Sequence, residues 1–228
     1  MNLDFSDDQK FLQSEAKKFL AKENSIKRCR SVLDKSESID SELWQKIVEL
    51  GWTGIRIPEE FNGLGLGHLE LCVIAEELGR FLAPVPFSSS VYLFTETIIK
   101  YASEDLKKDI LPKLVSGEIV GTLAVTEDFL APSSSNITTE VSNNKIIGKK
   151  IAVPDGGIAT HSIIVCKSSG GVDLRLIDHS DEGVTISSQE IVDDSRGHFC
   201  IELDSTPSML VGDENNGWEQ YESIIKVI

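Results

Sequence analysis

The chain has 228 residues, which is enough for one large domain or two small ones with a buried core. Hydrophobic residues make up 40% and charged residues 26% of the total, as is typical of a soluble globular protein. Acidic residues outnumber basic residues by 37 to 22, and the formal net charge is −15. Because nonspecific binding of nucleic acids requires neutralisation of phosphates, this charge argues against a nucleic-acid partner.

The sequence also lacks the patterns of export, membrane insertion and metal binding. The N-terminus is acidic and carries no signal-peptide pattern, and no apolar run approaches the length of a membrane span. The cysteines are far apart, so we expect reduced thiols and no metal site; they are Cys29, Cys72, Cys166 and Cys200. Together these features predict a cytoplasmic protein.

The first part of the chain carries helical signals. Ser6 begins a capping-box pattern with Gln9, and apolar residues then recur at helical spacing, which predicts an amphipathic helix. A second helix is predicted from Asp40 to a stop at Gly51. Residues 57–67 are predicted to form a loop, because they contain a proline and three alternating glycines.

Three further helices are predicted before residue 117. They cover residues 68–79, 90–101 and 103–115, and each has a largely apolar face. Pro112 lacks an N–H group, so we expect it to kink or interrupt the last of these helices.

The pattern changes after Gly117 from helical to strand-like. Short apolar or alternating segments recur at a spacing of roughly 8–12 residues, which is typical of an antiparallel sandwich or barrel. The predicted strands cover residues 120–126, 137–141, 145–148, 162–166, 172–177, 183–186 and 199–203. The predicted fold class is therefore α+β, with an N-terminal all-helical domain followed by an antiparallel β-sandwich or barrel domain.

A helical signal returns near Trp218, ten residues before the last residue. We therefore expect an N-terminal helical domain at 1–117, a middle β domain at 118–213 and the start of a truncated C-terminal helical domain at 214–228. The last segment predicts an apolar helical stripe that nothing in the chain covers, made of Trp218, Tyr221, Ile224, Ile225 and Ile228.

The common catalytic motifs are missing. The sequence contains no GxSxG, P-loop or HExxH motif, and the glycines of the 57–67 loop do not have the GxGxxG spacing. The four scattered histidines are interpreted as surface residues. Two segments offer more chemistry, at 124–128 and 148–157, because backbone groups and a hydroxyl at a strand end suit the edge of a planar heterocycle.

The order of several segments resembles that of the acyl-CoA dehydrogenase family, and the resemblance covers essentially the whole chain. Each segment alone is weak, but their order and spacing together are fairly specific. The matching segments are FSDDQ (5–9), IPEEFNGLGLG (57–67), IAEELGR (74–80), ILPKLVSGE (110–118), AVTE (124–127), residues 148–157 and VGDENNGW (211–218).

This resemblance implies a flavoprotein that uses FAD to remove two hydrogens from Cα and Cβ of an acyl-CoA thioester. It implies an acyl-CoA substrate, an electron acceptor such as an electron-transfer flavoprotein, and a homo- or hetero-oligomer. The family's catalytic glutamate belongs to a C-terminal helical domain, so no residue of this chain is assigned as the catalytic base.

The resemblance also assigns site residues by position. Val125 and Thr126 match residues that hydrogen-bond the isoalloxazine edge, and Ala152, Val153 and Pro154 match a second flavin-contacting segment. Substrate binding is assigned, more loosely, to two serines near the flavin and the thioester, Ser133 and Ser134.

The chain departs from the family pattern at these same segments. Many members have Trp-Ile-Thr or Trp-Ile-Ser where this chain has Ala152, Val153 and Pro154, so an indole and a hydroxyl are missing. Two alternatives therefore stay open. One is a non-catalytic partner subunit or degenerate paralogue that binds no flavin itself, and the other is a stand-alone binding module.

Overall fold

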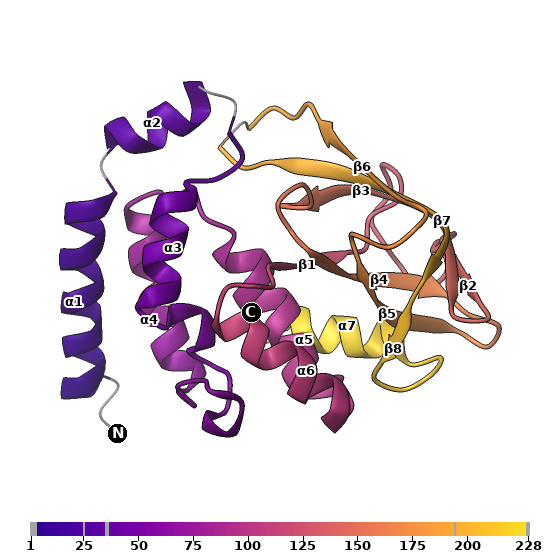
Figure 1. The fold of residues 1–228 in the computed structure, drawn as a ribbon, viewed down its shortest axis with the longest axis horizontal. Helices are drawn as coiled ribbons and strands as arrows, with labels where there is room; N and C mark the ends of the chain where they lie inside the picture. The colour runs from indigo at the N-terminus through magenta and orange to yellow at the C-terminus, as the bar shows by residue number, and fades with distance from the viewer. Residues whose placement is uncertain (1–3, 25, 35–36, 194, 227–228) are drawn as a thin grey trace.

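The computed structural model describes residues 4–24, 26–34, 37–193 and 195–226. Figure 1 shows a helical part beside a twisted sheet, with the last helix lying between them. The α-helices are α1 (Asp7–Glu23), α2 (Ile26–Asp34), α3 (Ser41–Glu49), α4 (His68–Arg80), α5 (Glu96–Tyr101), α6 (Glu104–Val115) and α7 (Gly217–Ile225), and a π-helix (Ser88–Thr95) precedes α5. The strands are β1 (Gly121–Ala124), β2 (Glu140–Ser142), β3 (Lys145–Pro154), β4 (His161–Lys167), β5 (Val172–Asp178), β6 (Val184–Gln189), β7 (His198–Pro207) and β8 (Met209–Val211).

The predicted helix starts at Ser6 and Asp40 are confirmed by their caps. The Ser6 side chain accepts a hydrogen bond from the N–H of Gln9, whose side chain bonds back to Ser6, so α1 begins with a complete capping box. Asp40 caps α3 in the same region as predicted. Helix α2 was not predicted, because its nine residues are mostly polar and only Val32 is buried.

Pro112 was expected to kink or interrupt its helix, and the structure shows that it does not interrupt it. Helix α6 runs through Pro112 to Val115. Leu111 and Leu114 on either side of the proline are buried in the core, so packing holds the last turn although one backbone hydrogen bond is lost.

The β part is one mixed sheet with the strand order β6-β7-β3-β2-β4-β5-β8. Most neighbouring strands are antiparallel, as the sequence predicts. The exceptions are β1, which pairs in parallel with β4, and a single parallel bridge between β2 and β4. Two of the predicted strands, 172–177 and 162–166, form the long antiparallel pair β5 and β4.

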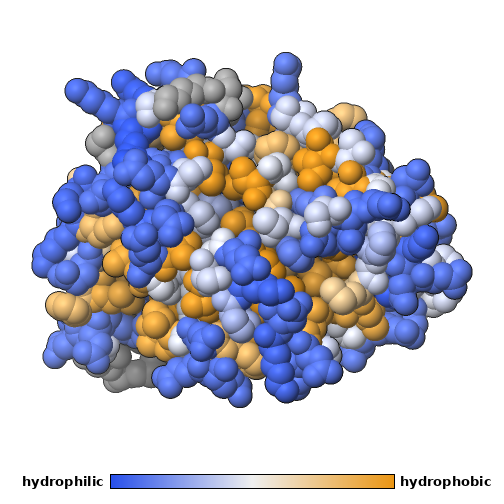
Figure 2. Space-filling model, in the orientation of Figure 1, coloured by the Kyte–Doolittle hydropathy of each residue, from blue (hydrophilic) through white to orange (hydrophobic). Residues whose placement is uncertain are grey.

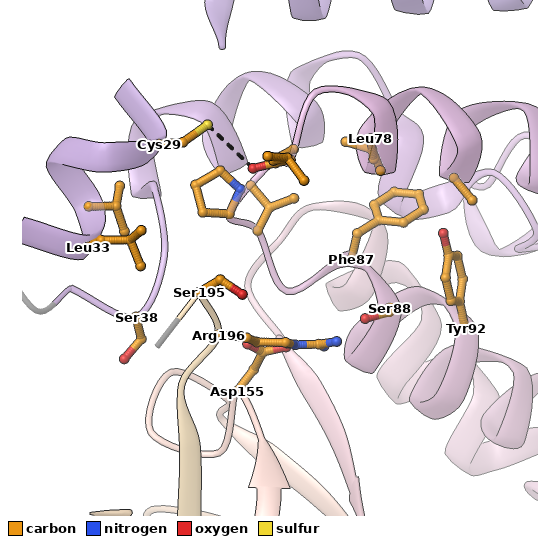
Figure 3. Close-up of a pocket in the computed structure, with 17 residues that line it drawn as sticks. Cys29, Leu33, Ser38, Leu78, Phe87, Ser88, Tyr92, Asp155, Ser195 and Arg196 are labelled. Carbon is orange, nitrogen blue, oxygen red and sulfur yellow. Dashed lines mark hydrogen bonds and ion pairs between the residues drawn. The ribbon is translucent and has the colours of Figure 1, made fainter. Parts of the chain in front are cut away.

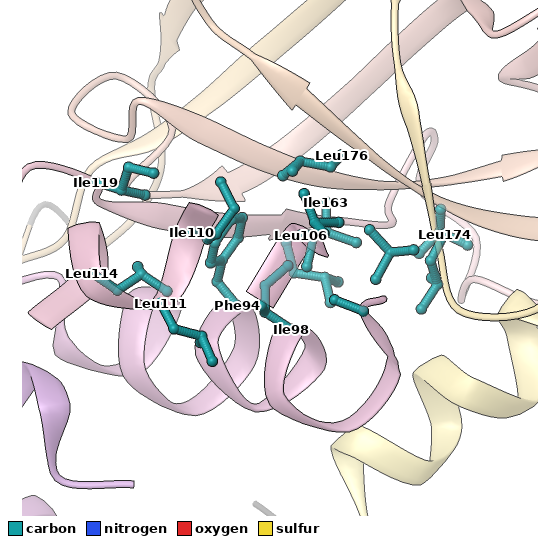
Figure 4. Packing of buried hydrophobic residues seen from close by; sticks show 14 of the residues in the cluster. Phe94, Ile98, Leu106, Ile110, Leu111, Leu114, Ile119, Ile163, Leu174 and Leu176 are labelled. Atoms are coloured by element: carbon teal, nitrogen blue, oxygen red, sulfur yellow. The ribbon is translucent and has the colours of Figure 1, made fainter. Parts of the chain in front are cut away.

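The largest hydrophobic cluster joins the helices to the sheet. Figure 4 shows side chains from the π-helix, α5 and α6 packed against side chains of the strands above them. Phe94, Ile98 and Leu111 come from the helical side, and Ile163 and Leu174 come from the sheet; all five are fully buried. The helical and β parts therefore share one core.

Helix α7 closes this core, which corrects the prediction of an uncovered stripe. Ile224 is buried, and Trp218 and Tyr221 pack against the shared cluster. The helix contacts both β5 and α5, which supply the covering surface. Ile225 remains partly exposed, and Ile228 lies outside the described residues.

Charged and polar residues cover much of the face shown in Figure 2, with apolar residues visible between them. Among the helices described, none combines the length and the apolar character needed to cross a bilayer.

Candidate functional site

The two segments predicted to bind flavin lie side by side. Val125 and Thr126 continue the chain directly after β1, and residues 152–154 form the end of β3. The N–H of Ile151 donates to the carbonyl of Thr126 at 2.8 Å. The Thr122 hydroxyl donates to the carbonyl of Pro154 at 2.7 Å. These two bonds join segments that are separated in the sequence by a polar, turn-rich stretch; the second of them links residues 32 positions apart.

A buried ion pair fixes this junction. Lys150 is fully buried, and its ammonium group lies 2.6 Å from a Glu127 carboxylate oxygen and 3.2 Å from the Val125 carbonyl oxygen. The Glu127 carboxylate also accepts hydrogen bonds from Thr138 N–H and hydroxyl and from Thr139 N–H. The lysine therefore ties β3 to the strand end that precedes Glu127.

This environment shifts the titration of Glu127. Burial by itself raises the pKa of Glu127, but the hydrogen bonds from Lys150 and Thr138 outweigh it and hold the pKa at about 2. The carboxylate is therefore charged throughout the physiological pH range and balances the lysine.

The dependence of the unfolding free energy on pH tests the contribution of the Glu127–Lys150 ion pair. Because the pKa of Glu127 is depressed in the folded state, its contribution is present above the ordinary pKa of 4.5 and is lost as the pH falls towards 2. Between about pH 6 and pH 3 we expect the wild-type chain to lose about 1–2 kcal/mol of unfolding free energy that Glu127→Gln does not lose. Urea unfolding of both chains measures this, and parallel pH profiles would contradict it.

A β-bulge shapes the second segment. The register between β3 and β7 shifts between Lys150 and Val153, and Ala152 in the bulge has a φ of +51°. The N–H of Ala152 donates to the side chain of Gln189 at 2.6 Å. The bulge turns the Ala152 methyl group outward, whereas Val153 is buried in the sheet core.

The two segments of the junction differ in the hydrogen-bonding groups that they leave free for a ligand. The Thr126 hydroxyl has no hydrogen-bond partner among the described residues and is half-buried, so it is free to bond a ligand. On the other side, Pro154 has no N–H, its carbonyl already accepts from Thr122, and Ala152 offers only a methyl group. The first segment thus fits the polar edge of a flavin, and the second supplies only an apolar wall.

The predicted substrate serines lie on the 127–136 loop and not in the hydrogen-bonded junction. Ser133 bonds within the loop, with its N–H to Asn136 and its hydroxyl 3.0 Å from that of Ser135. Ser134 lines a separate hollow beside Trp218 at the start of α7.

Sequence reasoning missed two residues that organise the site, Glu127 and Lys150. Both residues belong to the segments 124–128 and 148–157 that the sequence analysis selected. A lysine in a β-strand, however, is ordinarily expected to face solvent. Alternation along β3 was the available signal, because Lys150 lies four positions after the buried Ile146 and therefore on the same face of the strand.

The surface interpretation of the histidines is wrong for His179. Its Nε2 lies 2.6 Å from the Ser162 hydroxyl oxygen, and its Nδ1 is buried without a partner among the described residues. Burial lowers the pKa of His179 to about 4, so the ring is neutral at pH 7 and acts as part of the packing beside β4.

Comparison with known proteins decides the family. The family model described as "Acyl-CoA dehydrogenase, N-terminal domain" matches residues 6–118. The chain belongs to the acyl-CoA dehydrogenase family. The mitochondrial isovaleryl-CoA dehydrogenase of Pongo abelii is 27% identical over 232 residues, covering 93% of this chain and 54% of that protein.

Solved structures agree with this assignment. The Tcur3481-Tcur3483 steroid ACAD G363A variant is 27% identical with a TM-score of 0.84, covering 96% of this chain and 60% of that one. The ChsE4-ChsE5 complex from Mycobacterium tuberculosis is 19% identical with a TM-score of 0.85, covering 100% of this chain and 62% of that one, and shows the fold alone. The chain spans about half the length of the curated relatives it matches.

Proposed function

We propose that this chain is the N-terminal and middle part of an FAD-dependent acyl-CoA dehydrogenase. The observation that carries the proposal is the hydrogen-bonded junction of residues 125–126 with 152–154, which presents the free Thr126 hydroxyl beside the apolar bulge at Ala152. We also propose the division at 1–117, 118–213 and 214–228, and the match of the family model to residues 6–118 supports its first boundary.

In this proposal the chain orients the cofactor and the substrate. FAD, when bound, supplies the acceptor for the hydride that leaves Cβ of the acyl group. Val125 and Thr126 would bond the polar edge of the ring, and Ala152, Val153 and Pro154 would form the adjoining wall. Ser133 and Ser134 would contribute to binding of the thioester. The Lys150–Glu127 pair keeps the first segment at a fixed distance from the second. No residue of this chain is assigned as the base that removes the Cα proton.

Flavin retention tests the proposal. The purified chain, mixed with excess FAD and desalted, is expected to keep a visible flavin absorption spectrum. Thr126→Val removes one hydrogen bond with little change of shape, so we expect it to weaken FAD binding about fivefold. Thr185→Val, at an exposed position on β6, is the matched control and should not change binding. A wild-type chain that keeps no flavin contradicts the proposal.

A second candidate function is a partner subunit without flavin in an oligomeric dehydrogenase. The lack of free hydrogen-bond donors at Ala152 and Pro154 favours this candidate. In addition, one structural neighbour is a complex of two named chains. It predicts co-purification with a second dehydrogenase-like chain and no retained flavin.

Restoring the family hydroxyl separates the two candidates. Pro154→Thr is expected to tighten FAD binding severalfold if the junction is a flavin site, because it adds a hydroxyl group and a backbone N–H to the wall. Ala152→Trp is not an equivalent repair, since the positive φ at this position disfavours a bulky side chain. Isothermal titration calorimetry with FAD measures the affinity of both variants. Unchanged affinity in Pro154→Thr would favour the partner subunit.

A further inference from the structure

A pocket of about 380 Å³ lies between the helical part and the sheet, and one of its lining residues, Asp155, directly follows Pro154 in the chain. Figure 3 shows its walls, with Cys29 and Leu33 on α2, Leu78 on α4, and Phe87 and Tyr92 around the start of the π-helix. None of the residues 125–126, 133–134 or 152–154 lines it. Its volume falls within the range of small-molecule sites, and most of its wall is apolar.

One end of the pocket is polar and rigidly built. The side chain of Asp155 is buried, with 1% of its surface exposed, and one of its oxygens accepts from three donors. They are the Ser89 hydroxyl at 2.5 Å and the Arg196 Nε and Nη2 at 3.2 and 2.6 Å. The network therefore joins the π-helix, the end of β3 and the segment before β7.

Arg196 keeps donors for a ligand. Its Nη1 has no hydrogen-bond partner among the described residues, and the side chain is about one third exposed. Figure 3 shows the guanidinium group extended along the pocket towards Ser88, whose hydroxyl also has no bond to another described residue. Two groups that can donate hydrogen bonds thus face the same end of an apolar space.

The charge at this end selects the ligand. The positive charge of Arg196 is already balanced by the buried Asp155, so a carboxylate ligand would lie against a neutral pair and near another carboxylate. A neutral acceptor, such as a ketone or ester carbonyl, would accept from Nη1 without this repulsion.

We propose that this pocket binds an uncharged, mainly apolar compound that carries a carbonyl acceptor at one end. The carbonyl bonds Arg196 Nη1 beside Ser88, and the apolar body lies among Leu33, Leu78 and Phe87. The inference goes beyond the proposed function, because it requires neither flavin nor a thioester.

Binding of 2-octanone to the flavin-free chain tests the proposal, with octanoate as the charged analogue. Saturation-transfer NMR and a titration are expected to show saturable binding of 2-octanone and at least fivefold weaker binding of octanoate. Leu33→Trp fills the pocket from the partly exposed side of α2 and should abolish binding. Leu69→Trp, at an exposed position outside the pocket, is the matched control and should leave binding unchanged.

A separate variant tests whether Arg196 donates a hydrogen bond to the ligand. Arg196→Lys keeps the charge beside Asp155 but removes Nη1, so we expect 2-octanone to bind about fivefold more weakly while the chain stays folded by circular dichroism. The proposal is overturned if 2-octanone does not bind, if Leu33→Trp binds as well as wild type, or if octanoate binds more tightly than the ketone.

Discussion

Replacing Lys150 by methionine is expected to lower the free energy of unfolding by about 3–5 kcal/mol and to abolish flavin retention. The substitution keeps the length of the side chain but leaves the Glu127 carboxylate, with only 9% of its side chain exposed, without its cation. It also removes the bond to the Val125 carbonyl, so the strand end that presents Thr126 loses its attachment to β3. Urea unfolding and the flavin absorption test measure the two effects.

The neighbouring lysine supplies the control. Lys149 pairs with Glu202 across β3 and β7, but both side chains are more than half exposed, so Lys149→Met should change stability by less than about 0.5 kcal/mol. The double variant Lys150→Met with Glu127→Gln should lose less unfolding free energy than the two single variants lose in total, because no buried charge is left unpaired. Strictly additive effects would show that the pair does not hold the junction.

Removing the Phe94 ring is the second substitution for which we expect a large effect. Phe94 lies on the π-helix, is fully buried, and packs where the helices meet the sheet (Figure 4). Phe94→Ala is therefore expected to cost about 3–5 kcal/mol and to loosen the helical and β parts together. Hydrogen exchange should report lower protection in both α6 and β4, and loss confined to the helices would contradict a shared core.

Gly121 explains why the ring fits. A Cβ atom at Gly121 would overlap the Phe94 ring, so Gly121→Ala should cost about 1–3 kcal/mol through overpacking. The smaller side chain in Phe94→Leu makes room for that methyl group, and the double variant should cost less than the sum of the single ones. A cost of Gly121→Ala that is independent of residue 94 would place its cause in the β1 backbone.

Local patterns predicted much of this fold. The capping box at Ser6, the cap at Asp40 and the apolar periodicity of residues 68–79 depend on neighbours within one or two helical turns, and they gave correct helices. The alternating and apolar strands from 162 to 177 were found for the same reason. The segments 125–126 and 152–154 were singled out by order and resemblance, and their pairing needed the structure.

Local sequence patterns were enough to predict the order of the helices and strands other than α2 and β8, because capping, periodicity and turn residues act over a few positions. The parallel pairing of β1 with β4, the burial of α7 and the Lys150–Glu127 pair became visible only in the folded chain. Each of these features brings together residues from different elements. Lys150 and Glu127 are 23 positions apart, and Arg196 and Asp155, which also bond, are 41 positions apart. Such contacts depend on how whole elements pack, and packing also decides whether a charged side chain lies in water or in the core.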